Sequence, residues 1–278
     1  TKSLRCSVLE LLFGTLKKAY NTSLRDNLRI IPFLFPLNSY LCVDFKQIIM
    51  KTRNLMLAML LLVVCSFTAS AQKKVAILGD SYSTFAGYLS PATNFTWYSA
   101  DLNSDIAKNN DVHSVEQTWW HLFITKMGYE LALNNSFSGS TICHTGYNKE
   151  DYTDRSFVTR LHHLGNPDMI IIFGGTNDSW ANAPIGEFQY EGWTNADLYN
   201  FRPAFAYMLH QLKQLYPNAE IYNITNSELS ESVTTSAEEI CRHYSVPNLL
   251  LKDVEKQWNH PSAKGMEAIC NQLIDLVK

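Results

Sequence analysis

Short apolar runs alternate with amphipathic stretches from residue 75 to residue 277, and this alternation constrains the fold more than any other feature. The apolar runs are Val75–Leu78, Glu130–Asn134, Met169–Phe173, Glu220–Thr225 and Asn248–Leu251. The stretches with helical spacing are Val115–Met127, Asp154–Leu164, Leu198–Tyr216, Glu231–Tyr244 and Pro261–Val277. The apolar runs are short and lack polar alternation, as is typical of strands buried on both faces of a parallel sheet. We therefore predict an α/β fold, a three-layer α/β/α sandwich with a central parallel sheet of about five strands.

Glycines and short polar residues follow the predicted strands, where a buried core needs neither. These segments are Gly79-Asp80-Ser81 after the first strand, Asn134–Gly139 after the second, Gly174–Asp178 after the third, and Asn259-His260-Pro261 beyond the fifth. Ligands of parallel α/β sheets bind at the carboxyl ends of the strands. A serine, backbone donors, an amide and a histidine are therefore expected to converge there, and together they are what nucleophilic acyl transfer requires.

Each of these segments also has a purely structural interpretation. Asp80 and Ser81 are ordinary residues for a turn that begins a helix, and so are Asn177 and Asp178. His260 precedes Pro261 and could be a surface residue at a helix start. All these interpretations would have to hold together, so the combination favours a catalytic site over four unrelated turns.

In these four segments the chain resembles the SGNH hydrolases, also called GDSL-type esterases and lipases, and the resemblance covers residues 72–278. The four motif residues of that family match Ser81, Gly139, Asn177 and His260. The resemblance implies the SGNH hydrolase fold, which is flavodoxin-like, and a serine hydrolase that acts on carboxylic ester bonds. His260 would take the proton of Ser81 and return it to the leaving alcohol. The resemblance also implies three oxyanion donors: the Ser81 and Gly139 N–H groups and the Asn177 side-chain amide.

One position departs from the family pattern. The family usually has an acid three residues before the histidine, and here that residue is Gln257. Gln257 or a backbone carbonyl could accept the Nδ1–H of His260, or another acid could substitute, with Asp253 and Glu255 the nearest in the sequence. A neutral acceptor stabilises the imidazolium less than a carboxylate does, so we expect a slower enzyme than a full triad gives.

Two long segments, 84–117 and 179–196, leave the carboxyl ends of strands and are rich in aromatic residues. Trp97, Trp180 and Trp193 are candidates for stacking on sugar rings, although each could instead pack its loop onto the domain. We therefore predict hydrolysis of short, acetyl-type esters on carbohydrate. The alternatives are a non-catalytic or weakly active glycan-binding relative, or an esterase for lipids, lysophospholipids or aryl esters.

Charge and motifs exclude several other functions. Residues 72–278 contain 14 Lys and Arg against 23 Asp and Glu, a net charge of −9, whereas the whole chain carries −3. This excess of acid, with no basic cluster, argues against nucleic acid and anionic membranes as partners. The sequence has no zinc motif and no phosphate loop, and we expect neither metal nor cofactor. The sequence leaves open the oligomeric state and a disulfide between Cys241 and Cys270.

The segment that begins at Met50 has the features of a secretory signal peptide. Lys51 and Arg53 precede a short apolar run at residues 55–64, and Ala69-Ser70-Ala71 offers a cleavage site after Ala71. We therefore predict a signal peptide at 50–71, a hydrolase domain at 72–278 and export to the periplasm or beyond the cell. Lipid anchoring at Cys65 is disfavoured, because Val64 before it is not small. Residues 1–49 are interpreted as translated upstream sequence, with a disordered or genuine extension as the alternative.

Overall fold

The computed structural model describes residues 50–53, 56 and 72–278. Contacts divide the chain into two units, Thr1–Ser70 and Ala71–Lys278, and the second is described below. The upstream segment 1–49 lies outside the described residues. Most of the predicted signal peptide also lies outside them, since only residues 50–53 and 56 of it are described. The interpretations of both segments therefore stay predictions. Within the described ranges, no helix is long and apolar enough to cross a membrane.

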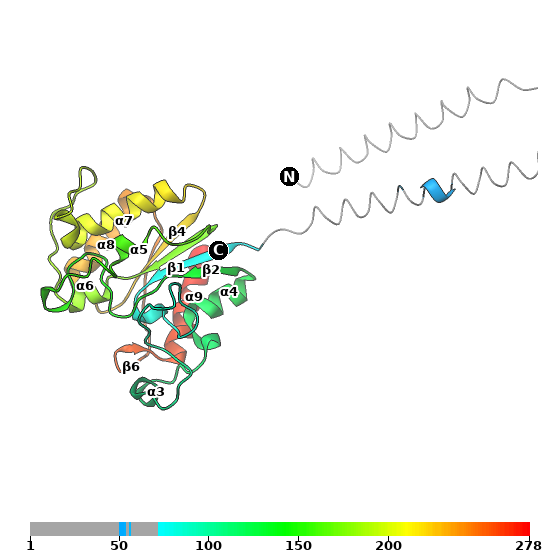
Figure 1. Ribbon diagram of the computed structural model, residues 1–278, viewed down its shortest axis with the longest axis horizontal. Helices are drawn as coiled ribbons and strands as arrows, with labels where there is room; N and C mark the ends of the chain where they lie inside the picture. The colour runs from blue at the N-terminus through cyan, green and yellow to red at the C-terminus, as the bar shows by residue number, and fades with distance from the viewer. Residues whose placement is uncertain (1–49, 54–55, 57–71) are drawn as a thin grey trace, which may run out of the picture. The chain divides into compact units, whose positions relative to one another are not determined.

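A sheet of five parallel strands forms the centre of the second unit (Figure 1). The strands are β1 (Lys74–Gly79), β2 (Glu130–Asn134), β3 (Met169–Phe173), β4 (Glu220–Thr225) and β5 (Asn248–Leu250), in the order β2-β1-β3-β4-β5. In the two central pairs of strands, Val75 of β1 lies opposite Met169 of β3, and Met169 lies opposite Glu220 of β4. The predicted α/β fold with a parallel sheet is thereby confirmed, and the strand positions agree with prediction to within a residue at each end.

Helices cover both faces of this sheet, and each face has its own apolar core (Figure 1). One core contains α4 (Trp119–Met127) and α9 (Ala263–Val277), and the other contains α5 (Phe157–Arg160), α7 (Phe201–Leu215) and α8 (Glu231–His243). Along β3, Met169 and Ile171 enter the first core while Ile170 and Ile172 enter the second. Successive strand residues point to opposite faces, so a strand covered on both sides must be apolar throughout.

Three predicted helices begin later than their sequence patterns indicate. The stretch 198–216 becomes a helix only from Phe201, after the 3-10 turn η4 (Asp197–Tyr199). The stretch 115–127 is divided at Thr118, whose extended backbone separates the 3-10 turn η2 (Val115–Gln117) from α4 and whose hydroxyl caps α4 at the His121 N–H. The stretch 154–164 keeps only α5, which begins at Phe157, where the main-chain N–H binds the Thr141 carbonyl oxygen at 3.0 Å. A local cap therefore sets the start of α4, and a contact with a distant loop lies at the start of α5.

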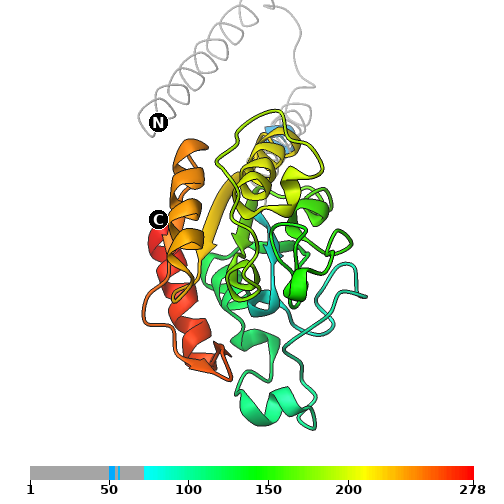
Figure 2. The ribbon, with the colours of Figure 1, turned by 90° about the vertical axis from the view of Figure 1, so that its left-hand side faces the viewer.

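The remaining elements are short and lie mostly in the loops between the strands. They are η1 (Ser81–Ser83), α3 (Asp105–Asn109), η3 (Tyr147–Lys149), α6 (Thr176–Trp180), η4 (Asp197–Tyr199) and a hairpin of β6 (Lys256–Gln257) and β7 (His260–Pro261). The hairpin was not predicted. Its two-residue turn, Trp258-Asn259, has φ values of 50° and 61°, as a type I′ turn requires. It precedes α9 directly (Figure 2).

The three cysteines of residues 72–278 are buried free thiols. Cys241 of α8 lies in the core on one face of the sheet, and Cys270 of α9 lies in the core on the other face. The disulfide that the sequence left open is therefore not formed.

Candidate active site

The turn after β1 holds Ser81 in a fixed position. Asp80 caps η1 by accepting the Tyr82 N–H at 3.0 Å, and Ser81 is 5% exposed. A Cβ on Gly79 would lie 2.5 Å from the Ser83 Cβ and 2.6 Å from the Ser136 Oγ. Because real Cβ atoms do not approach other atoms so closely, the strand can end here only in glycine.

His260 of β7 contacts the serine. Its Nε2 lies 2.9 Å from the Ser81 Oγ, and its Nδ1 lies 3.2 Å from the main-chain carbonyl oxygen of Trp258. A carbonyl oxygen can only accept, so Nδ1 carries the hydrogen and Nε2 is left to accept from the Ser81 hydroxyl. Burial lowers the pKa of His260 from 6.5 to about 4, with smaller contributions from the Trp258 carbonyl, which raises it, and Lys256, which lowers it. The ring is therefore a neutral base at neutral pH.

The side chains expected to orient His260 face elsewhere. The Gln257 Oε1 accepts the Asp111 N–H at 2.9 Å. Asp253 is exposed in the loop after β5. Glu255 accepts the Ser262 hydroxyl at 2.7 Å. The expectation of a Gln257 or Asp253 side chain at the ring is therefore corrected in favour of the backbone alternative. The tight turn brings a main-chain carbonyl, rather than the residue three positions earlier, to Nδ1.

Asn177 and Gly139 lie at the ends of the neighbouring strands. Asn177, in the first turn of α6, donates from Nδ2 to the Ser140 carbonyl at 3.0 Å and accepts the Tyr147 hydroxyl at Oδ1 at 2.7 Å. These two bonds fix the orientation of the side-chain amide. Its second N–H has no partner in them and can donate to another acceptor. Gly139 has φ of 82°, and a Cβ built on it would meet nothing within 4 Å, so its surroundings are open.

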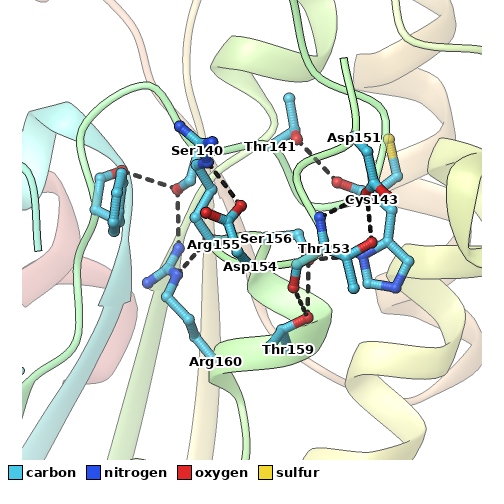
Figure 3. Close-up of polar contacts among 12 residues, drawn as sticks. Ser140, Thr141, Cys143, Asp151, Thr153, Asp154, Arg155, Ser156, Thr159 and Arg160 are labelled. Carbon is cyan, nitrogen blue, oxygen red and sulfur yellow. Dashed lines mark hydrogen bonds and ion pairs between the residues drawn. The ribbon is translucent and has the colours of Figure 1, made fainter. Parts of the chain in front are cut away.

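A buried arginine, which the sequence analysis missed, ties these strand-end loops together. Arg160 of α5 donates to the main-chain carbonyls of Gly79 and Asn135. It also donates to the Ser140 Oγ at 2.9 Å (Figure 3). Burial lowers the pKa of Arg160 to about 9. The available signal was an arginine beside the apolar residues Phe157, Val158 and Leu161. Arg160 joins the nucleophile turn to the loop that contains Gly139.

Asp178, the neighbour of Asn177, supports the same loop from the third strand end. Its carboxylate accepts the Ile142 N–H at 2.8 Å and the Cys143 N–H at 3.2 Å. Burial raises the pKa of Asp178 to about 6, although these two N–H groups counteract part of that rise. The three strand-end loops are therefore linked by buried hydrogen bonds.

Two of the three predicted aromatic residues lie beside His260. The Trp97 ring stacks on the imidazole, with centroids 3.5 Å apart and planes 7° apart, and the Trp180 ring lies edge-on at 6.2 Å. Trp193 instead packs against Tyr207 and His210 of α7, outside this site, so its assignment to substrate binding is corrected. Trp258, which was not predicted, is 51% exposed at the turn of the hairpin.

A cleft of about 390 Å³ opens beside His260. It is lined by Trp180, Asn226, Ser227, Glu228, Lys256 and Asn259. Lys256 and Glu228 form an ion pair across it at 2.9 Å. A second hollow, of about 300 Å³, is lined by Tyr216, Glu220 and Pro247 near the amino end of β4, away from Ser81. Of the two hollows, the cleft is the one that adjoins His260, through Trp180 and Asn259 of its lining.

Comparisons with known proteins agree with this geometry. The family model of GDSL-like lipase/acylhydrolase matches residues 73–277. A solved structure from Bacteroides uniformis, provisionally named a GDSL-like lipase, is 62% identical over 75% of this chain and 96% of its own, with a TM-score of 0.72. One from Bacteroides ovatus with the same provisional name is 52% identical over 75% and 99%, also with a TM-score of 0.72. No curated protein matches significantly.

The fold and these similarities define an ester-hydrolysing serine hydrolase of the α/β/α type. The chain belongs to the GDSL-like lipase/acylhydrolase family. A family two carbohydrate esterase from Clostridium thermocellum, solved in complex with cellohexaose, shares the fold at 14% identity, a TM-score of 0.51 and coverage of 74% of this chain and 63% of its own.

Proposed function

We propose that this chain removes short, acetyl-type acyl groups from carbohydrate esters, with Ser81 as nucleophile and His260 as general base. The observation that carries the proposal is the 2.9 Å contact between the Ser81 Oγ and a neutral His260 Nε2. A neutral, correctly tautomeric imidazole within hydrogen-bond distance is what a serine needs to become nucleophilic.

The reaction proceeds in two halves. The Ser81 Oγ attacks the ester carbonyl carbon while His260 Nε2 takes the hydroxyl proton. The bond between the acyl carbon and the sugar oxygen then breaks, and the proton passes from His260 to that oxygen, which leaves as a hydroxyl. The negative charge on the carbonyl oxygen is stabilised by the Ser81 and Gly139 N–H groups and by the free N–H of Asn177. Water, activated by the same His260, then releases the acyl group from Ser81. The Ser81 N–H is suited to this role because the first N–H groups of a helical turn have no partner within it.

The exposed rings and the polar cleft support a carbohydrate rather than a lipid. Trp180 and Trp258 are 40% and 51% exposed beside His260, and flat aromatic faces can stack on sugar rings. The adjoining cleft is lined by amide, hydroxyl and charged side chains, which can hydrogen-bond to sugar hydroxyls. The carbohydrate esterase from Clostridium thermocellum, whose structure contains cellohexaose, has the same fold. Export by the signal peptide of residues 50–71 would bring the protein to such glycans.

A second candidate function is glycan binding without catalysis, because His260 has a neutral carbonyl partner in place of an acid. A serine-directed fluorophosphonate separates the two. We expect the wild type to be labelled and Ser81→Ala to be unlabelled, while Ser90→Ala, which alters an exposed serine on the following loop, keeps full labelling. A folded wild type that resists labelling would favour the binding function.

The substrate class is tested by a panel of acetylated sugars, acyl lipids, lysophospholipids and aryl esters. We expect the highest kcat/KM on an acetylated sugar. Longer acyl chains should be hydrolysed more slowly, because the cleft has a polar lining. A preference for a long-chain lipid would contradict the carbohydrate assignment and leave the serine mechanism intact.

A further inference from the structure

Aromatic rings surround His260 on several sides. Trp97 stacks face to face on the imidazole at 3.5 Å, while Tyr82 lies tilted at 5.1 Å and Trp180 and Tyr98 present edges at 6.2 and 6.4 Å. The Trp97 contact differs from the others because its plane is within 7° of the imidazole plane. One face of the histidine is therefore covered by the indole, and that face of Trp97 is not available to a sugar.

Hydrogen bonds of Trp97 and of its neighbour Tyr98 hold the indole in this position. Its N–H donates to the Thr84 Oγ1 at 2.8 Å, and the same hydroxyl donates to the Ser81 carbonyl at 3.0 Å. The next residue, Tyr98, is fully buried and donates its hydroxyl to the Pro261 carbonyl at 2.9 Å. Trp97 is thus fixed relative to both the nucleophile turn and the strand of His260.

The polar contacts of the His260 ring are two hydrogen bonds, from Nδ1 to the Trp258 carbonyl and between Nε2 and the Ser81 hydroxyl. These bonds fix the positions of the two ring nitrogens, whereas the tilt of the ring about the line that joins them depends on what packs against its faces. A carboxylate would add an ionic attraction to the imidazolium, which a neutral carbonyl lacks. A flat ring stacked on the imidazole restricts its plane directly, and its π face attracts the positive charge that forms when His260 takes the proton.

We propose that Trp97 is a positioning residue that fixes the plane of His260 and keeps water from one of its faces, so that Nε2 stays directed at Ser81 without an acidic partner. This inference rests on the proposed Ser81–His260 mechanism. It assigns Trp97 to the base of the reaction and leaves Trp180 and Trp258 to face the sugar.

The proposal predicts the direction in which the histidine titration moves. The groups around His260 are the Ser81 hydroxyl, the Trp258 carbonyl, the Tyr82 and Tyr98 rings, and Lys256 with its partner Glu228. Removal of the indole admits water, which raises the pKa of His260, and removes the π contact, which lowers it. Burial is the largest influence on this pKa, so the net change on loss of Trp97 should be upward.

The test compares Trp97→Ala, Trp97→Phe and wild type on an aryl acetate, whose small leaving group needs no sugar site. We expect Trp97→Ala to lower kcat by about 10- to 100-fold, as misplacement of a catalytic group does. Its KM should change by less than about threefold, because the interaction lost is made to the base and not to the substrate. The acidic limb of its pH profile should move upward, and Trp97→Phe, which keeps a stacked ring, should recover most of the activity.

Trp193→Ala is the matched control, since it removes a tryptophan that packs on α7 outside the site. Trp193→Ala should leave the acidic limb of the pH profile at its wild-type position, even if it lowers the melting temperature. The proposal is overturned if Trp97→Ala has wild-type kcat and an unmoved limb, or if Trp97→Phe is as impaired as Trp97→Ala while its melting temperature is that of the wild type.

Titration of the His260 ring by NMR distinguishes failure of this proposal from failure of the proposed function, because it does not require catalysis. An upward pKa in Trp97→Ala, together with no fluorophosphonate labelling of the wild type, would keep the positioning role and reject the esterase mechanism. Labelling of the wild type with an unchanged His260 pKa in Trp97→Ala would keep the mechanism and reject the positioning role.

Discussion

At the scale of single residues, the state of His260 depends on its surroundings more than on its type. The ring is buried among aromatic side chains. Within the part of the chain that the structure describes, its hydrogen-bond partners are the Ser81 hydroxyl and the Trp258 carbonyl oxygen. Neither partner carries a charge that would stabilise an imidazolium. The neutral form is therefore favoured, which suits a base at rest but makes the charged intermediate harder to reach.

The lowered pKa of His260 predicts the pH dependence of the reaction. The base must be neutral, so activity is present above the pKa of His260 and is lost as the pH falls through it. We expect the acidic limb of kcat/KM, which reports the free enzyme, to lie at about pH 4 rather than at the ordinary value of 6.5. Initial rates on an aryl acetate between pH 3 and 8 would measure it, and a limb at 6.5 would mean that the ring is hydrated.

At the scale of elements, the β6–β7 hairpin and the helix α5 assemble the site. The hairpin turn supplies the carbonyl that holds His260, and its Asn259 carbonyl accepts the Tyr82 hydroxyl at 2.7 Å, which links the hairpin to the nucleophile turn. Helix α5 supplies Arg160, whose guanidinium holds the loops after β1 and β2. The hairpin and α5 therefore both support catalysis by fixing the main-chain positions of the loops that contain the catalytic residues.

Because the carbonyl of Trp258 belongs to the main chain, the side chain should be dispensable for the chemistry. We expect Trp258→Asn, which suits the positive φ of a type I′ turn, to keep kcat on an aryl acetate within about threefold of wild type. KM for an acetylated glycan should rise, since an exposed ring is lost from the rim of the site. An equal loss of kcat on both substrates would show that the turn itself had changed.

The buried Arg160 predicts a stability difference between two neighbouring arginines. We expect Arg160→Met to lower the free energy of unfolding by at least about 2 kcal/mol, because each buried acceptor left without a donor costs about 1–3 kcal/mol. The matched control is Arg155→Met, which removes a partly exposed ion pair with Asp154 and should cost less than about 1 kcal/mol. Urea unfolding measures both. Equal effects would show that the Arg160 hydrogen bonds add no net stability.

At the scale of the whole molecule, parallel topology brings together residues that are far apart in the sequence. Ser81, Gly139 and Asn177 follow three adjacent strands, β1, β2 and β3, and His260 arrives from beyond β5. All four strands end at the same edge because they run in the same direction. The same sheet separates the two cores and keeps Cys241 apart from Cys270.

Stability of the 72–278 unit should therefore not depend on redox conditions. Its cysteines are buried free thiols, and the two that were candidates for pairing lie on opposite faces of the sheet. We expect the same melting temperature with and without a reducing agent. Labelling of this unit by a thiol reagent should require unfolding. A clear fall in melting temperature on reduction would contradict the separation of the two cores.

The sequence by itself determined the strands, the order of the layers and the four motif residues. Each strand is a local apolar run, and the motif residues are side chains with recognisable neighbours. Only the tertiary structure decided what holds His260. Its Nδ1 partner is a backbone carbonyl, which every residue has and no sequence pattern marks. The Trp97 stack depends on how a long loop returns to the sheet, and the link through Arg160 depends on where the loops after β1 and β2 meet. Interactions between the backbone and distant segments leave no local signature, so they become visible only when the chain is folded.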